Sequence, residues 1–99
     1  MNPVIVTLCG DIDLASREAI DDTLAQAVAC ARDDGVDVVV DLSGVTFLDS
    51  TGMSCLVLAS RALGPDHSVY VRDPRPMTRR VLEIAGLGQM ICDRSTADS

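Results

Sequence analysis

The chain contains no lysine, and all eight of its basic residues are arginines. Lysine is required by the Walker A phosphate-binding loop, by the nucleotide site of protein kinases and by Schiff-base enzymes. A lysine is also the usual companion of the phosphorylated aspartate in receiver domains. Its absence argues against all four classes and indicates a protein that does not activate ATP by itself.

Aromatic residues and long apolar runs are also scarce. Aromatics make up 2% of the 99 residues and hydrophobic residues 47%, so the core must be aliphatic. This length suits one small domain, which we place over 1–99 with its core at about 4–92 and a polar tail at 93–99. No apolar run approaches the roughly 20 residues of a membrane span, and no signal peptide is visible. We therefore expect a cytoplasmic protein without a membrane partner.

Clustered metal ligands are missing as well. The four cysteines are scattered and form no C-x-x-C pair, whereas zinc sites need clustered ligands, so we expect neither a metal nor a cofactor. In a reducing compartment we expect the thiols to be small buried side chains, with a redox disulfide as the alternative. These residues are Cys9, Cys30, Cys55 and Cys92.

Negative charge dominates the first half of the chain. Residues 1–49 carry ten acids and two arginines, and residues 50–99 carry five acids and six arginines. An acidic front half argues against direct binding of nucleic acid or of anionic membranes. The later arginines include a cluster that we expect to be a solvated face, with a partner's acids or the chain's own acidic loops as alternatives. The cluster consists of Arg72, Arg75, Arg79 and Arg80.

Apolar periodicity predicts alternating strands and helices. Helices are expected from an N-cap at Ser16 to a stop at Gly35, from about 50 to 63 and from 76 to 85. The β-branched run at 36–42 is typical of a strand covered on both sides. The other strands are expected at 4–9, 68–72 and 90–92, with Gly10 stopping the first. The order β-α-β-α-β-α-β predicts an α/β fold with a mainly parallel or mixed sheet flanked by helices.

Polar side chains follow several of the predicted strands. Loops at 10–13, 43–51 and 73–74 should gather at the carboxyl edge of the sheet, where ligands usually bind. His67 precedes a strand and should lie at the opposite edge, which argues against a Ser-His-Asp triad and against hydrolase chemistry. The candidate neighbours at the carboxyl edge are Asp11, Asp13, Asp49, Ser50, Thr51 and Asp73.

The segment Asp49-Ser-Thr-Gly52 has two interpretations. Read alone, it is an N-cap, because Asp, Ser and Thr oxygens accept from free backbone N–H groups at a helix start. However, it offers three cap residues where one suffices. Gly52 also makes the helix less stable than alanine would, which suggests that something approaches the helix start closely. The second interpretation is a phosphorylation site, because the N–H groups and dipole of a helix start accommodate a phosphoryl group.

Three stretches of the sequence resemble the anti-sigma factor antagonist family of STAS domains over residues 4–92. They are "GDIDLAS" at 10–16, "VVVDLSGVTFLDSTGMSCLVLASR" at 38–61 and "RPMTRRVLEIAGLGQMI" at 75–91. The resemblance implies a small sheet flanked by helices. It also implies that Ser50 is phosphorylated by a partner anti-sigma factor, a serine-protein kinase, and that Asp49 helps orient the hydroxyl. Thr51, Gly52 and Met53 would complete the contact surface, bordered by Asp11 and Asp13.

The function implied by this resemblance is partner switching in transcription regulation. The unphosphorylated protein would bind the anti-sigma factor and free the sigma factor, phosphorylation would weaken that binding, and a phosphatase would restore it. ATP and magnesium would belong to the kinase. Family members usually carry a strand before the one at 4–9 and a helix after the last strand. We therefore expect an exposed sheet edge, which invites homodimerisation.

Two other functions are compatible with the residues. The first is a STAS-like module that binds a small ligand or acts as a scaffold without being phosphorylated, with the "DST" hydroxyls as cap and ligand contacts. The second is a thiol-controlled regulator, suggested by four cysteines in so short a chain.

Overall fold

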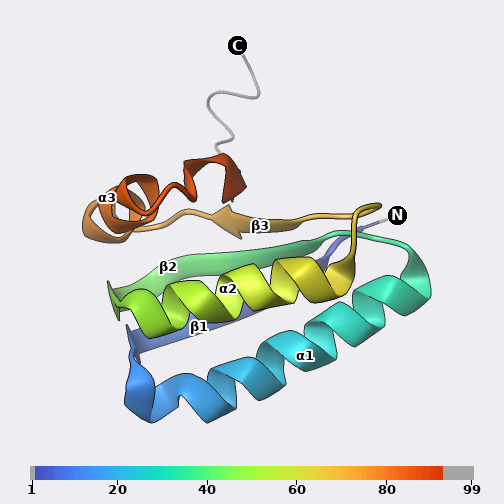
Figure 1. The fold of residues 1–99 in the computed structure, drawn as a ribbon, viewed down its shortest axis with the longest axis horizontal. Helices are drawn as coiled ribbons and strands as arrows, with labels where there is room; N and C mark the ends of the chain where they lie inside the picture. Colours follow the sequence, from blue (N-terminus) through green and yellow to red (C-terminus); the bar gives the residue numbers. More distant parts are fainter. Residues whose placement is uncertain (1, 93–99) are drawn as a thin grey trace.

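Among residues 2–92, which are those the structure describes, the computed structural model contains one sheet of four parallel strands (Figure 1). The strands lie in the order β1-β2-β3-β4, so β1 and β4 form the sheet edges. The predicted α/β class is confirmed, and the predicted tail at 93–99 lies outside the described residues. The strands are β1 (Val4–Ile12), β2 (Val38–Leu48), β3 (Val69–Arg72) and β4 (Ile91–Cys92).

Three helices connect the strands, together with the single turns η1 (Leu14–Ser16) and η2 (Gly88–Met90). Gly35 ends the first helix in the left-handed conformation, and its N–H donates to the Ala31 carbonyl. Within residues 2–92, no helix is both long enough and apolar enough to cross a membrane. The helices are α1 (Arg17–Asp34), α2 (Ser50–Leu63) and α3 (Pro76–Ile84).

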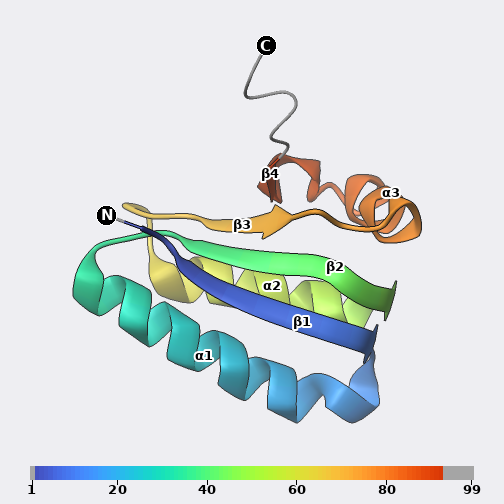
Figure 2. The same ribbon diagram turned by 180° about the vertical axis from the view of Figure 1, so that it is seen from behind.

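Helices α1 and α2 cover one face of the sheet and leave much of the other face open (Figures 1 and 2). Along the strands, buried residues alternate with more exposed ones. Ile5 and Phe47, for example, are each 52% exposed. The expectation that 36–42 is covered on both sides is therefore wrong, because Val39 is only half-buried. The core lies between the sheet and α1 and α2; it includes Val6, Leu8, Val38, Val40, Leu24, Val28 and Leu56.

Strands β1 and β2 are longer than the sequence predicts. Gly10 does not stop β1; it takes a φ of 78° within the strand, which continues to Ile12. Strand β2 runs past Ser43 and Gly44 to Leu48, and two register shifts in its pairing with β1 absorb the extra residues. The extension moves the carboxyl end of β2 six residues beyond the predicted end, roughly 20 Å along the strand.

This extension separates Asp73 from the other candidate residues. Strand β3 ends at Arg72, which pairs with Asp41 in the middle of β2. Asp49 lies after the far end of β2, so the expectation that Asp73 joins it at one edge is wrong. By contrast, the placement of His67 at the opposite edge is confirmed, since its ring lies 3.5 Å from Asp37, just before β2.

The Asp41 carboxylate joins β2 to β3. It accepts the Ser43 backbone N–H at 2.9 Å and an N–H of Arg72 at 2.9 Å. These contacts, led by the hydrogen bond from Ser43, lower the pKa of Asp41 to about 2. Arg75 donates to the Ser43 carbonyl at 3.0 Å. Part of the predicted arginine cluster is therefore bound to the chain's own groups rather than forming a purely solvated face.

We predict that Asp41→Asn makes stability less dependent on pH in acid. Because the folded pKa of Asp41 lies below its value of 3.8 in a free chain, its contribution is present above about pH 4 and is lost as pH falls toward 2. Allowing for screening by solvent, we expect the variant to lose about 1 kcal/mol at pH 7. Urea unfolding followed by circular dichroism, from pH 7 to pH 2.5, measures this.

Asp66→Asn is the matched control, because Asp66 is exposed in the loop before β3. The difference between wild type and Asp41→Asn should narrow below pH 4. A difference that stays constant over the whole range would contradict this account of Asp41.

Candidate functional site

Asp49 joins the start of α2 to the end of β1. Its carboxylate accepts the backbone N–H groups of Thr51 at 2.9 Å and Gly52 at 3.2 Å, so it is the N-cap of α2. Its own N–H donates to the Ile12 carbonyl at 3.2 Å. The cap interpretation of this segment is confirmed, and a single aspartate supplies it. Neither the Ser50 hydroxyl nor the Thr51 hydroxyl is needed as the cap.

Gly52 is buried where the first turn of α2 touches both long strands. A Cβ atom added at this position would lie 2.4 Å from Leu48 Cδ1 and 2.6 Å from Ile12 Cγ2. The close approach expected at Gly52 is therefore made by the protein's own strands. Since the residue is buried, it positions the site and adds little to any surface that a partner could touch.

Ser50 is the first residue of α2 and is exposed, whereas Thr51 is half-buried. Met53 is also half-buried and packs against the core. The two hydroxyls of the "DST" segment thus differ in accessibility. The hydroxyl of Ser50 is the one that another protein reaches most easily.

Asp11 and Asp13 lie at the end of β1, next to the end of β2. The register pairs Asp11 with Phe47 and Ile12 with Leu48, directly before Asp49 and Ser50. The structure therefore brings the 11–13 and 49–53 segments together, as the sequence predicts.

Both aspartates are held in place by hydrogen bonds. Asp11 is exposed and accepts the Thr46 hydroxyl at 2.6 Å. Asp13 caps η1 through the Ala15 N–H at 3.1 Å, and its own N–H donates to the Ser16 hydroxyl at 3.0 Å. Ser16 is at the N-cap position of α1, as expected, but its side chain does not cap that helix.

Leu14 is a surface residue that sequence reasoning missed. It follows Asp13 directly and is 72% exposed. A large apolar side chain in a polar turn was the available signal, because such exposure is typical of a contact surface. Thr46 was also missed, since its role depends on the extension of β2.

The charge around Ser50 has two opposing parts. The start of α2 is the positive end of its dipole, which favours a negative group there. However, the carboxylate of Asp49 already accepts two of the first N–H groups, and Asp11 and Asp13 lie near the same edge. A phosphoryl group on Ser50 would therefore extend outward into solvent instead of folding back onto the helix.

The cysteines are less buried than expected. Only Cys55 is buried, and burial, with Asp21 adding to it, raises the pKa of its thiol to about 11, so it is protonated at neutral pH. Cys9 and Cys92 lie on β1 and β4, with two strands between them, roughly 14 Å apart. A disulfide needs Cα atoms within about 7 Å, so this pair cannot be bridged in the fold. Cys30 is exposed on α1.

Comparison with known families identifies the fold. The family model described as "Mlab, STAS domain" matches residues 1–92. The chain belongs to the STAS domain family. In this STAS domain, the Asp49-Ser50-Thr51 segment lies at the start of α2, directly after the long strand β2.

Two curated relatives of this STAS domain carry the name of an anti-sigma factor antagonist. Two curated proteins from Mycobacterium tuberculosis, strains CDC 1551 / Oshkosh and ATCC 25618 / H37Rv, are called anti-sigma-F factor antagonist RsfB. Each is 31% identical over 83 residues, covering 84% of this chain and 66% of the relative. The chain thus spans about two thirds of the length of these relatives.

Solved structures of STAS proteins share the fold. An anti-sigma factor antagonist from Mycobacterium paratuberculosis is 30% identical with a TM-score of 0.75, covering 88% of this chain and 72% of that one. The anti-sigma factor antagonist SpoIIAA in its unphosphorylated form is 21% identical with a TM-score of 0.73, over 90% and 76% of the two chains. Bacillus SpoIIAA in its phosphorylated form is 22% identical with a TM-score of 0.61, over 95% and 86%.

We predict that Gly52→Ala destabilises this STAS domain. Alanine favours a helix by about 1 kcal/mol over glycine, but its Cβ would overlap Ile12 and Leu48. Overpacking of this kind typically costs about 1–3 kcal/mol. Because two atoms would lie well under 3.0 Å from the added Cβ, we expect the upper part of this range and a net loss of roughly 1–2 kcal/mol. Urea unfolding of the purified variant measures the change.

Ser54→Ala tests the same helix without the overlap, because Ser54 is exposed two residues further along α2. It should change the free energy of unfolding by no more than about 0.5 kcal/mol. If Gly52→Ala is as stable as wild type, the close packing of α2 on the strands is not the reason for glycine.

Proposed function

We propose that this STAS domain is an anti-sigma factor antagonist that phosphorylation of Ser50 switches off. The observation that carries the proposal is the exposed Ser50 hydroxyl at the first position of α2, beside a cap that does not use it. The names of the Mycobacterium tuberculosis relatives support the same role. Phosphorylated and unphosphorylated forms of a protein with the same fold support regulation by phosphate.

In the unphosphorylated state, the carboxyl edge of β1 and β2 binds the anti-sigma factor. Met53 lies beside the accessible polar groups of this edge and packs against the core. These polar groups come from Asp11, Asp13, Asp49, Ser50 and Thr51. Binding there would hold the anti-sigma factor and release the sigma factor. The domain acts on transcription through this protein contact and not by binding DNA, consistent with its net charge of −7.

The anti-sigma factor is also the kinase in this proposal. The Ser50 oxygen attacks the γ-phosphorus of ATP, the bond to the oxygen bridging the β- and γ-phosphates breaks, and ADP leaves. The hydroxyl proton passes to a base of the kinase. ATP and magnesium belong to the kinase, so the domain is a substrate and not an enzyme. A phosphatase would hydrolyse the phosphoserine and restore binding in the cytoplasm.

Phosphorylation releases the partner through charge and bulk. The phosphoryl group adds about 1.5 to 2 negative charges and three acceptor oxygens to an edge that already carries three carboxylates. Because Asp49 already accepts the N–H groups of Thr51 and Gly52, the group extends into the space that the partner needs. The exposed position of Ser50 lets the domain keep its fold.

We predict that Ser50→Ala abolishes labelling by the cognate anti-sigma kinase and ATP. Wild-type protein should gain a single phosphoryl group, measured by intact mass and located by peptide mapping. Thr51→Ala, its half-buried neighbour on the same helix turn, is the matched control and should still be labelled. Phosphate located on Thr51 or elsewhere in wild-type protein would contradict the assignment of Ser50.

We predict that Ser50→Asp weakens binding of the anti-sigma factor at least tenfold, because it places a negative charge in the contact surface. Isothermal titration calorimetry with the purified anti-sigma factor measures this, and circular dichroism should remain native. Ser54→Asp is the control: this exposed residue lies one turn further along α2. Equal binding by Ser50→Asp and wild type would refute the switch.

In that case, a rise in the melting temperature of the free domain on addition of nucleotide would favour the alternative function, a ligand-binding module.

A further inference from the structure

The exposed apolar side chains are concentrated at one end of the domain. Among residues 2–92, six large hydrophobic side chains are exposed. Four of them belong to η1, to the end of β2 and to α3, which lies beside the end of β2 in both views (Figures 1 and 2). This is the end at which α2 begins with Ser50. The four are Leu14, Phe47, Met77 and Ile84. Such a concentration of exposed apolar side chains is typical of a contact surface.

Phe47 is the least expected of these residues at a surface. It is the only phenylalanine of the chain, yet the core is filled without it. Its neighbour Leu48 is buried against the first turn of α2, so Phe47 points to the open face of the sheet, where it is 52% exposed. Aromatic side chains contribute much of the buried area of protein interfaces. Phe47 also lies only three residues before Ser50.

Leu14 lies beside the same edge, on η1, and is 72% exposed. Asp11 links it to Phe47, because Asp11 is the Cα partner of Phe47 in the strand register and lies three positions before Leu14. Within residues 2–92, no ion pair neutralises the carboxylate of Asp11 or of Asp13. The edge therefore presents unpaired negative charge next to two exposed apolar side chains.

A stable protein contact needs more surface than the polar groups of this edge supply. Stable interfaces take about 800 Å² and roughly 20–30 residues from each partner. A contact centred on Ser50 must therefore extend over the neighbours of the polar groups. Leu14 and Phe47 adjoin those groups directly, through the chain and through the register of β1 and β2.

We propose that Leu14 and Phe47 are the apolar anchors of the contact with the anti-sigma factor. This inference rests on the proposed function and adds the chemistry of the partner's surface. That surface carries apolar side chains opposite Leu14 and Phe47, and an arginine or lysine opposite the carboxylate of Asp11. Burial of the two apolar side chains supplies most of the affinity, whereas the charge of Asp11 steers the encounter.

The first experiment is isothermal titration calorimetry of the full chain with the purified anti-sigma factor. Phe47→Ala and Leu14→Ala should each raise the Kd roughly tenfold, because each removes an apolar side chain that the contact buries. Phe47→Met keeps an apolar side chain of similar length and should recover most of the affinity. Circular dichroism and urea unfolding establish that each variant is folded.

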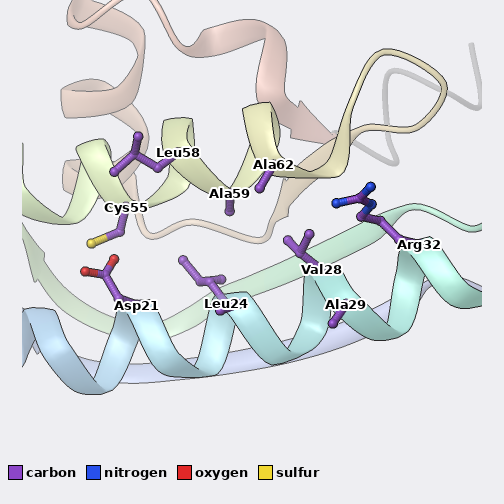
Figure 3. A pocket seen from close by; sticks show the side chains of 10 residues that line it. Asp21, Leu24, Val28, Ala29, Arg32, Cys55, Leu58, Ala59 and Ala62 are labelled. Atoms are coloured by element: carbon purple, nitrogen blue, oxygen red, sulfur yellow. The ribbon is translucent and has the colours of Figure 1, made fainter.

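Two control variants match the anchors in residue size and exposure. Ile5→Ala is the control for Phe47, because Ile5 is also 52% exposed on the sheet but lies six residues before Asp11, roughly 20 Å along β1. Leu58→Ala is the control for Leu14. Leu58 is 49% exposed beside the pocket between α1 and α2 (Figure 3), eight residues beyond Ser50 and roughly 12 Å along α2. Both controls should bind within about twofold of wild type.

The salt dependence of binding tests the charged part of the contact. Asp11→Asn removes the charge but keeps an oxygen that can accept the Thr46 hydroxyl. It should raise the Kd about fivefold at low salt and flatten the dependence of the Kd on salt concentration. Phe47→Ala should weaken binding and leave the salt dependence unchanged.

The outcomes separate this inference from the proposed function. A wild-type domain that does not bind the anti-sigma factor would remove the proposed function, and this inference with it. Binding that Ser50→Asp weakens but Leu14→Ala and Phe47→Ala leave at the wild-type level would overturn this inference alone. Equal weakening by Ile5→Ala would place the contact on the open face of the sheet. Weakening by Met77→Ala, with the two anchor variants unaffected, would place it on α3.

Discussion

The contact of Gly52 with Ile12 and Leu48 is the constraint on which the rest of the structure depends. It seats the first turn of α2 directly on the ends of two parallel strands, at a distance that no other residue allows. The Asp49 carboxylate then caps that turn, and its N–H bonds the end of β1. Together these contacts fix the direction in which the helix starts. Ser50 follows the cap and is left at the surface.

At this junction, the residues that stabilise the fold differ from the residue that we propose to be phosphorylated. The groups that stabilise the junction are buried or half-buried, whereas Ser50 and Asp11 are exposed. A charge added at Ser50 therefore acts on whatever lies outside the domain.

The order of the elements and the place of Ser50 could be predicted from the sequence, because helix periodicity, the Asp-Ser-Thr cap and Gly35 are local signals. The length of β2 could not, since Ser43 and Gly44 look like a loop until their pairing with β1 is known. That error also misplaced Asp73. The one-sided cover of the sheet could not be read from 36–42, because valines occupy both faces of this strand. The exposure of three cysteines has no local signal at all.

The central claim is that phosphate on Ser50 changes the surface of the domain and leaves its core intact. Amide NMR spectra of the stoichiometrically phosphorylated and unphosphorylated protein test it most directly. The account predicts that shift changes are confined to about 11–16 and 46–54, while the amides of β3 and α3 keep their positions. Changes that extend through β3 and α3, or loss of dispersed resonances, would contradict it.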